Sequence, residues 1–174
     1  LEKDALAQIE TITVDNARLV SNLHANLGGL YRMNGHPDLA REHMEKSISL
    51  LDQFNLLHIN DSIPQIANYA MFLTEQQEPE RGISELQKLS GIIKEYHSDD
   101  CLDYAKVQET LGTIYLMTAN LPQAKTHFKR AFKIYEKIWA DEPEMIEAKY
   151  QEIQELYPQI GFCIGKNLSG LLTK

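Results

Sequence analysis

Small and bulky apolar residues recur along this chain with a period of 42 residues. Small residues let two helix backbones approach each other, and bulky residues fill the space that remains. A period kept by several independent columns is the signature of a repeat architecture, and it predicts three consecutive repeats, each a pair of closely packed helices. The three columns are Gly28, Ala70 and Gly112; Ala40, Gly82 and Ala124; and Met44, Leu86 and Phe128.

Helix starts can be placed from proline and from capping residues. Proline is favoured in the first helical turn, where its missing N–H costs nothing, and this predicts the start of each repeat's second helix at Pro37, Pro79 and Pro122. Ser62, followed three residues later by Gln65, predicts a capping box at the start of the second repeat's first helix. We expect loops over residues 54–61 and 97–100.

The columns divide the chain into five segments. Residues 1–14 are interpreted as the second helix of a preceding partial repeat, which leads us to expect that the repeats continue upstream of Leu1. After the third repeat, Pro158 separates an expected first helix over 144–157 from a last helix over 159–172, and this pair reads as a terminal cap. The predicted segments are 1–14, the three repeats 15–57, 58–98 and 99–140, and the divergent capping pair 141–174.

The columns resemble the tetratricopeptide pattern, in which L-G-x2-Y on the first helix is followed by A-x3-F on the second. The first repeat carries Leu27-Gly28 and Tyr31, and the third carries Leu111-Gly112 and Tyr115. The middle repeat departs from the pattern with Ala70 and Leu73, and the tryptophan column holds His24, Ile66 and Gln108. The long period is similar to the repeats of kinesin light chains and of bacterial peptide-sensing regulators. This resemblance implies an all-α fold: a right-handed solenoid, or superhelix, of stacked antiparallel helix pairs.

Stacked helix pairs curve, so the first helices are expected to line a concave groove that binds a protein or peptide. One column on this face holds Asn26, Asn68 and Thr110, and an asparagine amide both donates and accepts, so it can grip a peptide unit. The resemblance implies this binding role for Asn26, Asn68 and, at the same column, Thr110. The alternative is that these side chains bond neighbouring helix ends or are merely solvated. The predicted binding residues are Asn22, Asn26, Arg32, Asn68, Met71, Lys106, Glu109, Thr110 and Thr113, and the same face also holds Ala25, Gly29, Ala67, Thr74 and Leu116.

Charges on the groove predict a polarity for the ligand. Arg32 lies in the first repeat, whereas Glu152 and Glu155 follow the third. We therefore expect an acidic ligand group near the first repeat and a basic one near the C-terminal helix.

Composition excludes several classes of function. A net charge of −8 opposes direct nucleic-acid binding, and no apolar run is long enough to span a membrane. Cys101 and Cys163 belong to no metal-binding spacing and indicate reduced thiols in the cytoplasm. The six histidines are scattered, and no nucleotide-binding or hydrolase motif is present, so we expect no enzyme, no cofactor and no metal.

Two further functions stay open at this point. The chain can be a sensory or regulatory segment of a larger protein whose effector domain lies outside residues 1–174. It can also be a self-association unit, because the N-terminal helix, lacking its repeat partner, exposes an apolar edge through which two copies can form a homodimer.

Overall fold

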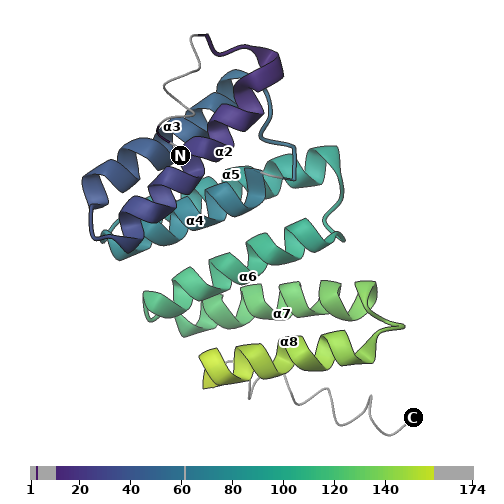
Figure 1. Ribbon diagram of the computed structural model, residues 1–174. Coiled ribbons are helices and arrows are strands. Elements are labelled where there is room, and N and C mark those ends of the chain that lie inside the picture. Colours follow the sequence, from purple (N-terminus) through teal and green to yellow (C-terminus); the bar gives the residue numbers. More distant parts are fainter. Residues whose placement is uncertain (1–2, 4–10, 61, 159–174) are drawn as a thin grey trace, which may run out of the picture. The chain divides into compact units, whose positions relative to one another are not determined.

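A computed structural model describes residues 3, 11–60 and 62–158 of the chain. All regular structure in these residues is helical, and neighbouring helices pack side by side in antiparallel pairs (Figure 1). This confirms the predicted all-α class with its helix pairs, whereas the right-handed superhelix stays a prediction. The described helices are α2 (Val14–Met33), α3 (Pro37–Gln53), α4 (Ser62–Glu75), α5 (Pro79–Tyr96), α6 (Leu102–Met117), α7 (Leu121–Ile138) and α8 (Pro143–Leu156).

The chain divides into two compact units, Leu1–Tyr96 and His97–Lys174. In the first unit α2 packs against α3 and α4 against α5, and in the second unit α6 packs against α7. The Tyr150 ring of α8 lies 4.5 Å from that of Phe132 on α7, so α8 belongs to the second unit's core. Most of the helix predicted for residues 1–14, and all of that predicted for 159–172, fall outside the described residues.

The second helices begin where the prolines predicted. Pro37 and Pro79 are the first residues of α3 and α5, and Pro122 is the second residue of α7. Before each of these helices the backbone makes the same turn, with a positive φ at Gly35 (74°), Gln77 (66°) and Ala119 (59°). Glycine adopts this conformation without penalty, but for Gln77 and Ala119 it costs about 1 kcal/mol. Hydrogen bonds repeat as well: the amides of residues 36, 78 and 120 each donate to the carbonyl oxygen five residues earlier, at 2.9, 2.8 and 2.7 Å.

The small-residue columns lie at helix–helix contacts, as predicted. A Cβ atom added to Gly28 would lie 2.6 Å from Met44 Cγ, and one added to Gly112 would lie 2.8 Å from the Phe128 ring. At Gly82 the obstacle is backbone, because the added atom would meet the carbonyl oxygen of Ala70 at 2.6 Å. Each column therefore sets how closely a helix pair can pack.

The predicted capping box at Ser62 is wrong. The Ser62 hydroxyl lies 2.6 Å from the carbonyl oxygen of Leu57 and 2.7 Å from that of Ile59, so it donates back into the preceding loop. The Gln65 side chain makes its hydrogen bonds with residues of α2 and α3 instead. A buried polar site on the neighbouring helices outcompetes the local cap for the Gln65 amide.

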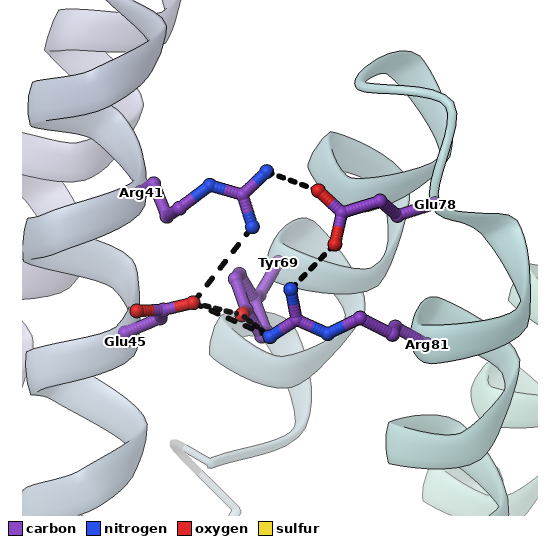
Figure 2. A network of polar contacts seen from close by, with 5 residues as sticks. All are labelled: Arg41, Glu45, Tyr69, Glu78 and Arg81. Carbon is purple, nitrogen blue, oxygen red and sulfur yellow. Dashed lines mark hydrogen bonds and ion pairs between the residues drawn. The ribbon is translucent and has the colours of Figure 1, made fainter.

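A polar network joins α3 to α4 and α5 (Figure 2). Arg41 and Arg81 each bond one oxygen of Glu78 at 2.5 Å, and Glu45 accepts from the Tyr69 hydroxyl at 2.7 Å. The two guanidinium groups, Arg81 first and Arg41 second, lower the pKa of Glu78. Because residues from three helices share the same charges, the network fixes the first repeat against the second.

No described helix is long and apolar enough to cross a membrane. Within residues 11–60 and 62–158 there is also no group of three or more metal-binding side chains.

Candidate functional site

The first unit contains a pocket of about 570 Å³, which we call the amide pocket. Three helices line it, and all five residues of the face predicted for the first repeat are among the lining. The lining residues are Asn22, Ala25, Asn26, Gly29, Arg32 and Met33 from α2, Met44 and Ser47 from α3, and Pro64, Gln65 and Asn68 from α4.

A buried polar network forms one wall of the amide pocket. Gln65 Oε1 accepts from the Ser21 hydroxyl at 2.8 Å and from the Ser47 hydroxyl, and an amide oxygen has two lone pairs for this purpose. Gln65 Nε2 donates to Asn22 Oδ1 at 2.5 Å. Ser21 and Ser47 are at most 1% exposed, so these bonds satisfy groups that water does not reach. The network thereby holds α2, α3 and α4 in place and fixes the Asn22 amide at the edge of the pocket.

Asn26 and Asn68 lie on the rim of the amide pocket, and both are exposed. Gln65 and Asn22 are engaged by other side chains, but neither Asn26 nor Asn68 has a side-chain hydrogen bond to another described residue. Within the described part of the chain, each of these two amides therefore has its donors and its acceptor available for a molecule in the pocket.

Arg32 forms a two-pronged ion pair within the first unit. Its Nε donates to Glu75 Oε2 at 2.8 Å, and its second nitrogen bonds Glu75 Oε1. The positive charge on the pocket lining is therefore balanced by Glu75. Met71, also predicted to bind, is half-buried and does not line the pocket.

The second unit contains a pocket of about 420 Å³, which we call the charged pocket. Of the four residues predicted to bind in the third repeat, Lys106, Glu109 and Thr110 line it. The lining residues are Leu102, Lys106, Glu109 and Thr110 from α6, Tyr135 from α7, Trp139 just after it, and Met145, Ala148, Lys149 and Glu152 from α8.

An ion pair between α6 and α8 forms the base of the charged pocket. Lys149 Nζ lies 2.8 Å from Glu109 Oε1 and 3.0 Å from Glu152 Oε2, and the Tyr135 hydroxyl donates to Glu109 Oε2 at 2.7 Å. Burial by itself lowers the pKa of Lys149, but Glu109 and Glu152 outweigh it, and the pKa is raised. Burial together with the Glu109 carboxylate raises the pKa of Tyr135. Lys149 is thus protonated at neutral pH and bonds both carboxylates.

The two threonines predicted to bind make bonds along their own helix. The Thr110 hydroxyl donates to the Lys106 carbonyl oxygen at 3.0 Å, and the Thr113 hydroxyl donates to that of Glu109 at 3.1 Å. Thr113 is buried and does not line the charged pocket. Thr110 therefore differs from Asn26 and Asn68, since its one proton is already donated.

Sequence reasoning missed polar residues that line or support the two pockets. Ser21, Ser47 and Gln65 of the first unit and Lys149 of the second were not among the predicted site residues. A signal existed: Gln65 and Lys149 occupy one column, two periods apart, where an inward-facing polar residue requires a partner.

Comparisons with known proteins agree with this architecture. Residues 62–137 match the family model of the tetratricopeptide repeat. Among solved structures, the crystal structure of BtubC (BKLC) from P. vanneervenii is similar, with a TM-score of 0.67 at 19% sequence identity, over 78% of this chain and 54% of that chain. This chain thus spans about half the length of that protein, and the likeness shows the fold. No curated protein matches the chain.

Proposed function

We propose that this chain, which carries tetratricopeptide repeats, acts by binding an extended segment of another protein in its amide pocket. Tetratricopeptide repeats are in general protein-interaction modules, and the proposed activity is binding without a chemical step. The observation that carries the proposal is the pair of exposed amides of Asn26 and Asn68, which lie on one pocket rim and have no side-chain partner among the described residues.

The chemistry of the lining supports a peptide ligand held mainly by its backbone. A peptide unit offers one N–H donor and one C=O acceptor, which match the acceptor and donors of an asparagine amide. Ala25 and Gly29 line the same pocket, and their small size lets a peptide main chain approach α2 closely.

The side chains of the bound segment are proposed to be uncharged at this pocket, which replaces the acidic ligand group expected from Arg32 in the sequence. Arg32 is balanced by Glu75, and the remaining lining consists of amides, a serine, methionines and small residues. A charged ligand group would lose its hydration here without gaining an opposite charge. Methionine adapts to varied shapes, so Met33 and Met44 can accommodate apolar ligand side chains of different sizes.

The test begins with a phage-displayed peptide library selected on the wild-type chain, followed by affinity measurements on the selected peptides. The variants N26A and N68A are each expected to weaken binding by about 5- to 10-fold, since a net hydrogen bond contributes about 1 kcal/mol. T110A is the matched control from the same column, and it is expected to leave affinity unchanged because the Thr110 hydroxyl is already bonded to its own helix. Circular dichroism verifies that the variants are folded.

Two results would contradict this proposal. One is a library that yields no binder to the folded wild-type chain. The other is a set of selected peptides that bind N26A, N68A and the wild type equally well. The regulatory and self-association functions suggested by the sequence depend on residues outside the described ones, and they stay predictions.

A further inference from the structure

Two histidines face each other across the first helix pair. The Nδ1 atoms of His24 on α2 and His43 on α3 are 2.8 Å apart, which is a hydrogen-bond distance. The His43 ring also stacks on Tyr31, with ring centroids 5.3 Å apart. His43 directly precedes Met44, which packs against Gly28, so these contacts join α2 and α3 beside that close approach.

The third repeat has the same arrangement with one difference. His127 occupies the column of His43 and stacks on Tyr115 at 5.2 Å, as His43 stacks on Tyr31. Its partner is Gln108 in the column of His24, and His127 Nδ1 lies 2.9 Å from Gln108 Oε1. The two helix pairs therefore share a histidine–tyrosine stack, but the histidine bonds a titratable ring in the first repeat and an amide in the third.

The two partners respond differently to acid. Gln108 Oε1 only accepts, so His127 donates its Nδ1 proton to it in both the neutral and the protonated form of the ring. Between His24 and His43 the bond requires one Nδ1 with a proton and one without. A first added proton can leave this bond in place, but when both rings are protonated two donors and two positive charges face each other. The second added proton is therefore the one that breaks the contact.

The groups around His24 determine how readily it is protonated. His24 is half-buried and lines a hollow of about 470 Å³, whose other described lining is Glu42, Glu45, Lys46 and Ser49 of α3. Burial, His43 and Lys46 lower the pKa of His24, and Glu42 opposes them. On the other side of His43, Tyr31 stacks on it and His36 contacts the Tyr31 ring. Glu45 is also bound by Tyr69 of α4 and by Arg81 of α5, which reduces its ability to stabilise an extra charge on the pair.

We propose that His24 and His43 form a pH-sensitive latch between α2 and α3, which makes the first repeat open in acid while the third repeat stays closed. The sign follows from linkage. A histidine whose folded-state pKa is lowered stabilises the fold fully above its unfolded value of about 6.5, and this stabilisation is lost as the pH falls further. Burial and Arg130 also lower the pKa of His127, but its bond to Gln108 survives protonation, so the third repeat loses less.

Amide hydrogen exchange, measured by mass spectrometry on the intact chain, tests the latch. Peptides from α2–α3 and from α6–α7 are compared in one sample, so each helix pair is a reference for the other. From about pH 7.5 to about pH 5, after correction for intrinsic exchange, the protection of α2–α3 is expected to fall about tenfold more than that of α6–α7.

Two variants exchange the partner of the stacked histidine between the first and the third repeat. H24Q gives the first repeat the glutamine–histidine pair of the third and is expected to remove most of the extra acid sensitivity. Q108H gives the third repeat a histidine pair and is expected to make α6–α7 acid-sensitive. Equal pH dependence of the two helix pairs in the wild type would overturn the proposal, as would an H24Q chain that keeps the full difference. Since glutamine at this column is already accommodated in the third repeat, H24Q is expected to fold.

Discussion

Gln65 and Lys149 occupy equivalent positions in the two units, and each connects its helix to preceding helices through a different kind of bond. Each lies on a first helix and extends toward the helix pair that precedes it. Gln65 bonds two buried hydroxyls and an asparagine amide, whereas Lys149 forms an ion pair with Glu109. The repeat scaffold therefore accepts either a neutral amide or a charged amine at this column.

The residues around Gln65 and those around Lys149 differ as sets. The hydroxyls of Ser21 and Ser47 have the methyl groups of Ala105 and Ala131 as their counterparts two periods on, and Ala25 is replaced by Glu109. A lysine therefore occurs where a carboxylate has been added and the hydroxyls have been removed. The requirement at this column is therefore a complete set of partners for whichever polar group occupies it.

The same difference sets the character of the two pockets. Gln65 adds its amide to those of the asparagines that line the amide pocket. Lys149 and Glu109 place opposite charges on the lining of the charged pocket. We therefore expect the two pockets to prefer different ligand groups, neutral in the first unit and charged in the second. Three variants test this comparison.

The largest effect is expected from K149M. Removing the amine leaves Glu109, whose side chain is 18% exposed, with a Tyr135 hydroxyl but no cation. An abandoned buried carboxylate costs 3–5 kcal/mol when fully enclosed, and the residual exposure here reduces the expected loss to about 2–3 kcal/mol. Denaturant unfolding monitored by the fluorescence of Trp139, the single tryptophan, reports this loss.

K137M is the matched control for this variant. Lys137 pairs with Asp100 in the same unit, but its side chain is 64% exposed, so its loss is expected to cost at most about 0.5 kcal/mol. If K149M and K137M destabilised the unit equally, the packing of α8 against α6 would not depend on the ion pair between Lys149 and Glu109.

The second largest effect is expected from Q65L. It removes the acceptor that the buried hydroxyls of Ser21 and Ser47 share. Ser21 then retains only its 3.1 Å contacts with the hydroxyl and carbonyl oxygens of Ser47, so the expected cost is about 1–2 kcal/mol. The triple variant S21A/S47A/Q65L also removes the hydroxyls, as the second unit does with Ala105 and Ala131, and it is expected to regain more than half of the loss. Thermal unfolding followed by circular dichroism separates the two variants. A triple variant less stable than Q65L would show that the hydroxyls have other functions in the fold.

The features of the fold that the sequence predicts are those with a period. The column of Gly28, Ala70 and Gly112 recurs every 42 residues, and the prolines at the second helices recur at nearly the same spacing; together they placed the helix pairs. The partners of buried polar groups do not recur, because Gln65 and Lys149 each have a different set. The false capping box at Ser62 has the same cause: local spacing matched a cap, but the Gln65 amide bonds residues of α2 and α3 that no local pattern identifies.

The smallest effect on stability is expected from E75Q, but this variant changes the charge of the amide pocket itself. Glu75 balances Arg32 at the amide pocket, and both side chains are about a third exposed, so breaking the pair is expected to cost only about 0.5 kcal/mol. Arg32 then carries an unbalanced positive charge on a lining that was neutral. Peptides selected on the wild-type chain, remade with one aspartate, are expected to bind E75Q about 3- to 5-fold more tightly than they bind the wild type, and salt should remove the gain. R32Q/E75Q is the control, since it lacks both charges and should show no such preference. A gain that persists in high salt, or in the double variant, would mean that the charge balance at Arg32 does not determine which ligands the first unit accepts.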